Sequence, residues 1–533
     1  MWREIRRPSV RLCCRLPAMS PKLHDIMKPT SLFLAAGISM VLPVCMQTAF
    51  AGDATVQAEH EAIGVSARAD TAARTTHPDA RWFPDAALGL FIHWGTSSVR
   101  AMNLSNCMIV GRPLRKQRIG DPTERERIIR EKDYNLDGRE PRITPNEYWT
   151  MAKDFNPQAY DPDKWLAAAK DAGFTYAVFT AKHHEGFAMW PSEAGDFNTG
   201  TWMNGRDLVG EYVEACRRHG LKVGLYFSPP DWYFDRNYKN FLYPGAARKT
   251  PEFPPLGPDL EPRTGKPTQA ELAAHHAAYA RLVRTQIEEL LTRYGKIDLL
   301  WFDGRPHFPG GENVISMKRI RELQPGIVVN PRLTGSGDFL TFERWGNFPK
   351  KRPSGWAEFC DTGWTNSWAF EDQRYRSTTF VIGYLARTRA WGMNFLLNVG
   401  PMSNGELPPP IYENMGILAR WMKANRASIH GAGPLPDGET ASVPATFDGT
   451  NRYLFAIPWF KPASAPYIAN QQPPRDEIVT IQGIKGRVTS ATLLASGQKL
   501  TFDVSDGVLR VNLPTSSRTG LVDVIRIRIS DNG

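Results

Sequence analysis

Cysteine is scarce in this chain of 533 residues, which contains only six. Three fall within the first 51 residues, and three are spread over the rest of the chain, at Cys107, Cys216 and Cys360. An odd number of widely spaced thiols matches neither a disulfide framework nor a C-x-x-C metal site. At this length the chain can bury a large core, and we expect more than one domain.

A strong excess of one charge is also absent from most of the chain. The formal net charge is +10, but the first 51 residues carry +5 of it. The remaining charge is modest and dispersed, which favours solubility over a polyanionic partner such as nucleic acid. Hydrophobic residues make up 42% of the chain and charged residues 23%, as in ordinary globular proteins.

Long apolar runs are missing as well. The run Ser31 to Val44 is too short to span a membrane, and no later stretch is a candidate for one. Basic residues precede this run and Ala49-Phe50-Ala51 follows it, which is the pattern of an export signal cleaved before Gly52. We therefore predict that residues 1–51 are a cleaved signal segment and that the mature protein is periplasmic or secreted.

Two details of this segment stay open. The basic region is long for a signal, so Met19 and Met27 are alternative start sites. A lipid anchor on Cys45 is a minor alternative, because the residues before it make a poor lipobox. Residues 52–78 are small, polar and unpatterned, and we predict a flexible lead-in there.

Several strongly apolar runs end in polar and aromatic residues, and helix-like segments follow them. The expected strands cover residues 88–92, 176–180, 222–226, 297–302, 326–330, 356–361 and 393–399, and the expected helices cover 161–172, 207–219 and 269–294. Continuous apolar runs are typical of buried parallel strands, and their alternation with helices favours a barrel. We predict an α/β fold, a (β/α) TIM-like barrel that need not be regular, over residues 79–430.

Two long polar insertions, residues 102–144 and 243–267, interrupt this alternation. Because they would leave from the face where such barrels carry their sites, we expect them to shape the rim of a pocket. Beyond Gly431 the pattern changes to short alternating strands separated by turn residues. That texture is typical of an all-β sandwich, which we predict over residues 431–533 as a domain with no catalytic cluster.

The run from Ile297 to Gly304 delivers one carboxylate, Asp303, to a glycine turn beside Trp301. Hydrolysis of a glycosidic bond with retention needs a carboxylate that attacks the sugar and a second acid or base about 5–5.5 Å away. On position alone, an aspartate that merely caps the turn before a helix is an equally good interpretation.

Other polar and aromatic residues also fall at the ends of expected strands: His93, the pair His183-His184, and Tyr226. Adjacent histidines suggest a metal, but neighbours on an extended strand point to opposite faces, and no third ligand follows at a typical spacing. Hydrogen bonding to hydroxyl groups is therefore the favoured role. Together with Trp301 as a stacking surface, these residues predict a monosaccharide pocket.

Four motifs resemble those of the α-L-fucosidases of glycoside hydrolase family 29. The resemblance runs in order from about residue 80 to 428 and rests on Leu88–Gly95, Ala181–Phe187 with Trp190-Pro191-Ser192, Trp301–Gly304 and Asn394–Pro401. It implies a retaining exo-hydrolase that acts on α-linked L-fucose without a metal or other cofactor, on a barrel followed by a β-sandwich. The implied partner is a fucosylated glycan or glycoconjugate.

The resemblance also implies roles for individual residues. Asp303 matches the nucleophile, and the residues matching sugar contacts are His93, Trp94, His183, His184, Tyr226, Trp301 and Arg332. Arg332 lies in a segment that resembles the family's Asn-Asp-Arg, with Pro331 where aspartate is usual. Further departures are Glu185 in place of aspartate and the segment Leu104–Cys107 where a Glu-Trp pair is usual.

The acid/base is less clearly marked, because the family varies in where it places that group. Glu343 ends a segment that resembles the family's Thr-Pro-Glu and is the favoured candidate. Glu358 lies in a segment that resembles Trp-Glu-x-Cys and is the runner-up, ahead of Asp361 and Asp338.

Two rival functions stay open beside hydrolysis of fucosides. One is a fucose-binding protein that has no working acid. The other is a glycosidase that prefers L-galactosides, since an apolar pocket for the fucose methyl group discriminates only modestly against an added hydroxyl. Candidates for such a pocket are Phe91, Phe395 and Trp391.

Overall fold

The computed structural model describes residues 74–111, 122–131, 143–244, 251–344, 347–372, 375–458 and 475–530. The predicted signal segment and most of the predicted lead-in lie outside these ranges. Within them, no helix is both long enough and apolar enough to cross a membrane. Cys107, Cys216 and Cys360 are all free thiols, in agreement with the prediction that they form no disulfide framework.

Eight parallel strands form one sheet in the order β5-β4-β3-β2-β1-β8-β7-β6. They are β1 (Leu88–Ile92), β2 (Tyr176–Lys182), β3 (Lys222–Phe227), β4 (Leu299–Phe302), β5 (Val328–Val329), β6 (Leu340–Glu343), β7 (Ala357–Asp361) and β8 (Asn394–Val399). Strands that follow one another in the chain are paired, except β5 and β6 at the two ends of this order, and β1 pairs with both β2 and β8. This is the strand order of a (β/α) barrel, so the predicted fold class is confirmed.

Within the described residues no ladder joins β5 to β6, and one buried aspartate connects them instead. Asp338 donates its backbone N–H to the carbonyl of Val329 (2.7 Å), and its Oδ2 accepts the N–H of Val329 (2.8 Å). Its Oδ1 accepts from Thr75 N (2.6 Å) and pairs with Arg321 (2.7 Å). Burial raises the pKa of Asp338. This minor acid/base candidate therefore closes the seam of the barrel.

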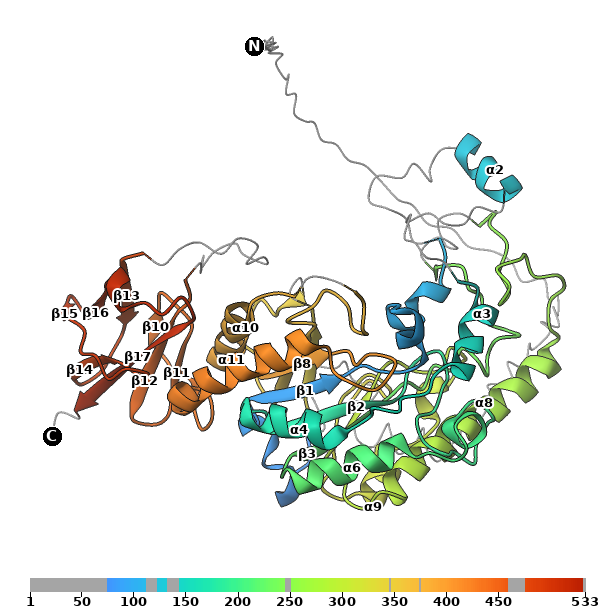
Figure 1. The fold of residues 1–533 in the computed structure, drawn as a ribbon, viewed down its shortest axis with the longest axis horizontal. Helices are drawn as coiled ribbons and strands as arrows, with labels where there is room; N and C mark the ends of the chain where they lie inside the picture. Colours follow the sequence, from blue (N-terminus) through green and yellow to red (C-terminus); the bar gives the residue numbers. More distant parts are fainter. Residues whose placement is uncertain are drawn as a thin grey trace, which may run out of the picture. The chain divides into compact units, whose positions relative to one another are not determined.

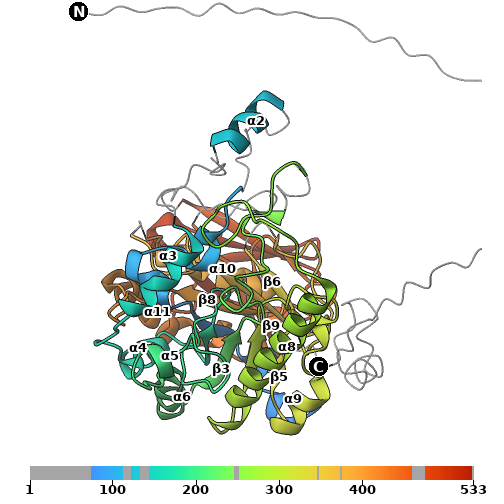
Figure 2. The same ribbon diagram turned by 90° about the vertical axis from the view of Figure 1, so that its right-hand side faces the viewer.

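Helices lie outside the strands, as Figures 1 and 2 show. They are α3 (Pro145–Thr150), α4 (Pro162–Asp171), α5 (Thr199–Trp202), α6 (Leu208–Arg218), α8 (Gln269–Thr292), α9 (Met317–Leu323), α10 (Thr378–Ala390) and α11 (Pro409–Asn425), and α2 (Pro122–Glu131) lies in the first insertion. Asp161 and Asp207 cap α4 and α6 by accepting backbone N–H groups, and Thr268 with Glu271 forms a capping box on α8. These caps begin the three helices near the predicted positions.

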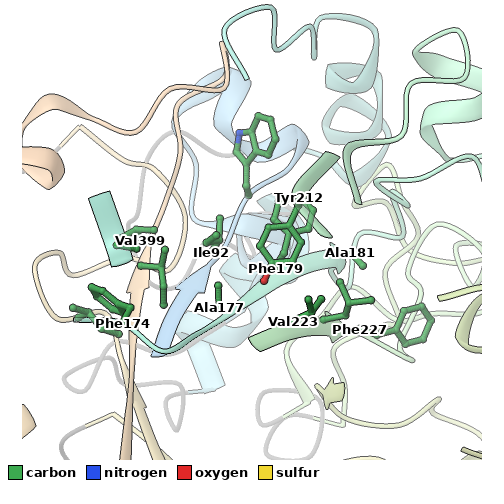
Figure 3. Close-up of a cluster of buried hydrophobic side chains, with 14 of the residues drawn as sticks. Ile92, Phe174, Ala177, Phe179, Ala181, Tyr212, Val223, Phe227 and Val399 are labelled. Carbon is green, nitrogen blue, oxygen red and sulfur yellow. The ribbon is translucent and has the colours of Figure 1, made fainter. Parts of the chain in front are cut away.

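Alternation along the strands separates two apolar layers. Ile92 and Phe179 face the helices, where the ring of Phe179 stacks on Tyr212 of α6 (5.0 Å between centroids), as Figure 3 shows. Phe91 and Tyr176 face the other way and help to fill the barrel interior. Because neighbouring strand residues point to opposite faces, the same runs build both layers. The interior layer is rich in aromatic rings, and it supports the side chains at the carboxyl ends of the strands.

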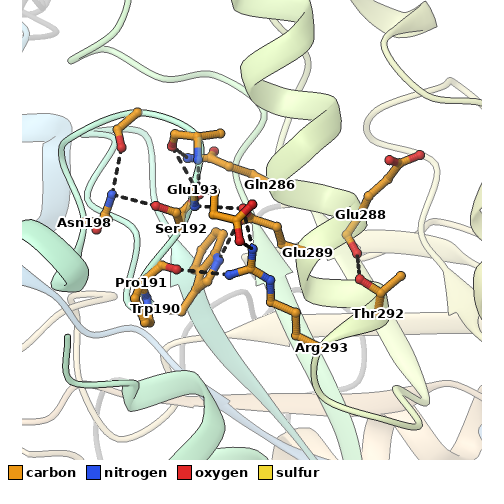
Figure 4. Close-up of polar contacts among 12 residues, drawn as sticks. Trp190, Pro191, Ser192, Glu193, Asn198, Gln286, Glu288, Glu289, Thr292 and Arg293 are labelled. Carbon is orange, nitrogen blue, oxygen red and sulfur yellow. Dashed lines mark hydrogen bonds and ion pairs between the residues drawn. The ribbon is translucent and has the colours of Figure 1, made fainter.

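The Trp190-Pro191-Ser192 motif fastens the chain after β2 to α8 (Figure 4). Glu289 accepts from the indole of Trp190 (2.8 Å) and from the backbone N–H of Glu193 (2.8 Å), and Arg293 donates to the carbonyl of Pro191 (3.1 Å). All of these groups lie outside the barrel interior, on the side of α8. This motif is therefore a structural anchor.

The carboxyl-terminal part contains two antiparallel sheets, in the orders β10-β13-β16-β15 and β14-β17-β12-β11-β9. The strands are β9 (Gly433–Pro434), β10 (Thr440–Ala441), β11 (Ala445–Phe447), β12 (Asn451–Ala456), β13 (Glu477–Gln482), β14 (Arg487–Leu493), β15 (Phe502–Ser505), β16 (Val508–Leu513) and β17 (Asp523–Ser530). Inward-facing residues such as Leu454, Ile481 and Ile525 form a separate core between them. The predicted sandwich is confirmed as a fold, and the domain limits stay a prediction.

Candidate active site

A cavity lies at the carboxyl ends of strands β1 to β7. Its lining consists of Phe91, His93, Leu104, Asn106, His183, His184, Tyr226, Trp301, Asp303, Arg332, Glu343, Cys360 and Trp368. The cavity encloses about 190 Å³, which is below the about 300–1,000 Å³ typical of sites for drug-sized ligands. A single small ring fits such a space better than a long chain does.

Asp303 follows β4 directly and presents its carboxylate to the cavity. Oδ2 accepts from the hydroxyl of Tyr226 (2.8 Å) and Oδ1 from Nη1 of Arg332 (2.8 Å), while Nε2 of His184 lies 3.4 Å from Oδ2. Burial favours the neutral acid, but the charge of Arg332 and the Tyr226 hydrogen bond outweigh it and hold the pKa of Asp303 below its ordinary value. The carboxylate is therefore ionised and oriented. Gly304 makes the next turn with a φ of 86°, a conformation that favours glycine.

Three histidines line the cavity, and hydrogen bonds at Nδ1 determine the tautomers of His93 and His184. Nδ1 of His93 lies 2.6 Å from Oδ1 of Asn398, whose amide N–H₂ donates to the carbonyl of Trp368 (2.6 Å). Nδ1 of His184 lies 2.6 Å from the hydroxyl of Ser228, which donates its own hydrogen to Pro230 O (2.7 Å). Because both partners can only accept, Nδ1 carries the hydrogen in each imidazole.

The third histidine, His183, has the same arrangement. Its Nδ1 lies 3.1 Å from the carboxylate of Glu185 and 3.2 Å from the hydroxyl of Ser105. Burial lowers the pKa of His93 to about 3 and also lowers the pKa of His184, with His183 adding to both shifts. His93 and His184 are therefore neutral imidazoles protonated at Nδ1, and in each of them Nε2 is left as an acceptor. The cavity is thus suited to a ligand that brings several hydroxyl donors.

The pair His183-His184 does not alternate between faces as an extended strand would. β2 ends at Lys182, and its register with β3 shifts between Thr180 and Lys182, so both histidines lie in the following turn. Their ring nitrogens and a carboxylate oxygen of Asp303 all lie within 4.8 Å of one another. The prediction that the two rings cannot face one ion was wrong. Arg332 already neutralises Asp303, which disfavours a cation there.

A second carboxylate enters the cavity from the end of β6. Oε2 of Glu343 accepts from Nη2 of Arg332 (2.6 Å), while Nη1 of the same guanidinium holds Asp303 (2.8 Å). One guanidinium therefore separates the two carboxylates and sets their spacing. Its carbon also lies 4.5 Å from the centroid of the Trp301 ring, a cation–π contact.

Arg344, directly after Glu343, has a backbone conformation that arginine rarely adopts. Its φ of 63° lies in the left-handed region, which costs on the order of 1 kcal/mol. Its guanidinium lies over the ring of Trp368 (4.9 Å) and donates to Thr362 (2.9 Å), and its backbone N–H donates to Cys360 O (3.0 Å). These contacts hold the strained turn that follows Glu343.

Comparison with known proteins identifies this arrangement. The model of the family described as alpha-L-fucosidase matches residues 55–427. The chain belongs to the α-L-fucosidase family, glycoside hydrolase family 29. It is an enzyme of that family, a retaining exo-hydrolase of α-L-fucosides.

The known relatives match this chain over most of its length. The tissue alpha-L-fucosidase of Macaca fascicularis is 27% identical over 408 residues, covering 72% of this chain and 76% of that protein, and that of Rattus norvegicus is 26% identical over 460 residues, covering 82% and 87%. Among solved structures, alpha-L-fucosidase isoenzyme 1 from Paenibacillus thiaminolyticus has a TM-score of 0.62 and 28% identity, covering 85% of this chain and 99% of that one.

Most of the residues that the fucosidase motifs predicted for the site do meet in the cavity. They are His93, His183, His184, Tyr226, Trp301, Asp303, Arg332 and Glu343. Trp94 is the exception, because its ring packs in the core against Tyr160 and Trp165 and its Nε1 donates to Met402 O (2.9 Å). It follows His93 beyond the end of β1 and points to the opposite side. A direct contact of Trp94 with a sugar in the cavity is not supported by this position.

Glu358, the runner-up for the acid/base, is also absent from the cavity lining. It lies on β7 with a fully buried side chain, and its two oxygens accept from the indole of Trp301 (2.9 Å) and the hydroxyl of Tyr176 (2.6 Å). Asp361, another minor candidate, accepts from the N–H of Thr362 (2.7 Å) and does not line the cavity.

Sequence reasoning did not place four lining residues in the site: Leu104, Asn106, Cys360 and Trp368. Leu104 and Asn106 come from the first insertion, in agreement with the expectation that it shapes the rim, and they lie where the family's Glu-Trp pair is missing. That departure was the only sequence signal for them. Of the three candidates for a methyl pocket, Phe91 lines the cavity, whereas Phe395 and Trp391 belong to the outer core.

Proposed function

We propose that Asp303 is the nucleophile and Glu343 the acid/base of this fucosidase. The observation that supports the pair is that both carboxylates line one cavity and share the guanidinium of Arg332, at 2.8 and 2.6 Å. A retaining enzyme needs two carboxyl groups about 5–5.5 Å apart, and a shared guanidinium keeps them at a separation of that order.

In the first step Asp303 attacks the anomeric carbon and displaces the aglycone. Its ionised state and its two hydrogen bonds, from Tyr226 and Arg332, point one oxygen at a defined place in the cavity. The Nε2 atoms of His93 and His184 accept hydrogen bonds from the sugar hydroxyls, and His183 lies beside them in the cavity lining. This binding energy holds the ring while the covalent fucosyl-enzyme forms.

Glu343 gives a proton to the leaving oxygen in the first step and takes one from water in the second. In the proposed reaction Glu343 exchanges its hydrogen bond with Arg332 for one with the leaving oxygen when the fucoside binds. Arg332 then donates its hydrogen bond to Asp303 alone.

The natural substrate in this proposal is a fucosylated glycan or glycoconjugate outside the cytoplasm. Its support is the predicted export signal together with a cavity that accommodates one terminal sugar. Measuring the fraction that is exported when residues 1–51 are removed tests the location, and retention of the shortened protein in the cytoplasm is the expected result.

The test of the nucleophile is Asp303→Gly assayed on an aryl α-L-fucoside. We expect kcat to fall by about 10³-fold or more, and added azide to restore turnover with an inverted fucosyl azide as product. Asp235→Asn is the matched control, because Asp235 pairs with His275 (2.8 Å) and does not line the cavity. Substantial activity of Asp303→Gly without azide would falsify the assignment.

A further inference from the structure

Glu358 is a buried carboxyl group that the proposed reaction does not use. It lies on β7, inside the barrel, below the cavity. Both of its oxygens are occupied, Oε1 by the indole N–H of Trp301 (2.9 Å) and Oε2 by the hydroxyl of Tyr176 (2.6 Å). A carboxyl group in this position cannot reach a leaving group, because Trp301 lies between it and the cavity.

The indole of Trp301 has one polar atom, and Glu358 binds it. The ring itself stacks on Tyr226, with 5.6 Å between centroids and 17° between planes, and the guanidinium of Arg332 lies 4.5 Å from its centroid. A hydrogen bond at Nε1 prevents the flat ring from turning or sliding between these neighbours. The position of the ring then defines where the guanidinium and the phenol can lie.

Those two neighbours are also the groups that bind Asp303. The hydroxyl of Tyr226 donates to Oδ2 and Arg332 donates to Oδ1, each at 2.8 Å. A continuous set of contacts therefore leads from Glu358 through Trp301 to both oxygens of Asp303. An ångström of displacement at a catalytic group can cost about 100-fold in rate.

We propose that Glu358 is a positioning residue, which anchors the indole of Trp301 and through it orients Arg332 and Tyr226 on Asp303. This inference rests on the proposed function, since it takes Asp303 as the nucleophile. Glu358 is thus assigned a part in the reaction different from that of an acid/base.

The barrel interior is built to keep this carboxyl group in place. Gly89 on β1 leaves room for the ring of Tyr176, because a Cβ at that position would lie 2.1 Å from its Cζ. Burial raises the pKa of Glu358 to about 7, although the bonds from Tyr176 and Trp301 and the charge of Arg332 act in the other direction. Protonation leaves one carbonyl oxygen, which still accepts from the indole. Both protonation states therefore hold Trp301.

Two substitutions at this position separate the two roles. Glu358→Gln keeps an amide oxygen for the indole and offers N–H₂ to the oxygen of Tyr176, so we expect kcat/KM within about threefold of the parent on both good and poor leaving groups. Glu358→Leu has a similar volume but no acceptor, so kcat/KM should fall by about 10- to 100-fold. Binding of free L-fucose, measured by calorimetry, should weaken in Glu358→Leu and persist in Glu358→Gln.

A double-mutant cycle with Trp301→Phe gives the decisive readout, because phenylalanine has no N–H for Glu358 to bind. In the Trp301→Phe background Glu358→Leu should lower kcat/KM by no more than about threefold further. Equal effects of Glu358→Leu in the two backgrounds would overturn the proposal. So would a Glu358→Gln variant that is inactive on poor leaving groups and rescued by azide, since that is the behaviour of an acid/base.

These outcomes are independent of the test of the nucleophile. If Asp303→Gly stays active, the proposed function fails, whereas the coupling between Glu358 and Trp301 in fucose binding is still measured by calorimetry. A melting temperature recorded for each variant shows that it is folded at the assay temperature.

Discussion

The barrel and the sandwich each contain an arginine that joins two carboxylates, and the two arrangements have different consequences. In the barrel, Arg332 binds Asp303 and Glu343. In the sandwich, Arg518 binds Glu477 (3.0 Å) and Asp523 (2.7 Å). The side chain of Arg332 is 24% exposed and that of Arg518 only 1%. The arginine thus lies in an open cavity in the barrel and in a closed interior in the sandwich.

Saturation of the hydrogen bonds explains why only one of these triads can act on a ligand. Arg518 also donates to Ala456 O (3.0 Å), and Asp523 accepts from the N–H and the hydroxyl of Thr519 (3.2 and 2.8 Å). Asp303 and Glu343 instead face a cavity in which histidine acceptors lie nearby. In the sandwich, Arg518 and Asp523 are buried with satisfied hydrogen bonds and join the two sheets, although Glu477 is 28% exposed, whereas the barrel triad faces a cavity that a ligand can enter.

The largest expected difference between the triads comes from removing one carboxylate charge in each. Glu343→Gln should lower kcat by about 10²- to 10⁴-fold on a fucoside with a poor leaving group and much less on one with a good leaving group, because only the former needs a proton. Glu477→Gln, the matched change in the sandwich, should leave both rates within twofold. Steady-state rates on the two fucosides check this, and equal losses for both would exclude an acid role for Glu343.

Removal of each arginine should separate activity from stability. Arg332→Met should lower kcat/KM by about 10²- to 10³-fold with little change in the unfolding midpoint, because it deletes one donor to the reacting group. Arg518→Met leaves Asp523 buried without its cation, which should cost about 3–5 kcal/mol of unfolding free energy while the folded protein keeps its kcat. Urea unfolding and rate measurements on both variants test whether activity is lost in Arg332→Met and stability in Arg518→Met. Similar stability losses in the two would mean that exposure does not distinguish the triads.

The smallest expected effect is a shift in pH dependence. Asp303 acts as the ionised nucleophile and its pKa lies below the usual aspartate range, so it stays ionised down to about pH 4. Loss of the Arg332 charge removes one cause of that depression, so in Arg332→Met the acidic limb of kcat/KM should move to higher pH by about one unit or more. A limb that stays in place or moves to lower pH would show that Arg332 does not control the ionisation of Asp303.

Much of the fold could be predicted because its signals are local. The apolar runs at β1, β2, β3, β4 and β8 are largely continuous, and Asp161, Asp207 and Thr268 mark the starts of three helices. β6 was not expected as a strand, because its four residues are half-buried and carry no apolar run. β5 has only two residues, and hydrogen bonds of Asp338 replace the ladder that would join β5 to β6.

The site was predicted where a residue follows directly on a strand and missed where a loop supplies it. Asp303, His93 and Tyr226 were found because strand ends converge in a barrel. Trp94 and Glu358 were assigned by resemblance, but a side chain's direction depends on where its strand ends and on which neighbours fill the interior. Leu104 and Trp368 come from segments without periodicity, and their only sequence signals are departures from family motifs, which do not show that a side chain enters the cavity.

The sequence by itself determined the family, the two kinds of domain and the nucleophile candidate, because ordered motifs and hydrophobic periodicity are properties of short segments. Only the tertiary structure decided which of several acidic residues share the cavity. Glu343, Glu358 and Asp338 lie within twenty-one positions of the chain, yet one faces the cavity, one lies beneath Trp301 and one closes the seam. Burial and hydrogen-bond partners come from residues far away in the sequence, and they set what each carboxyl group can do.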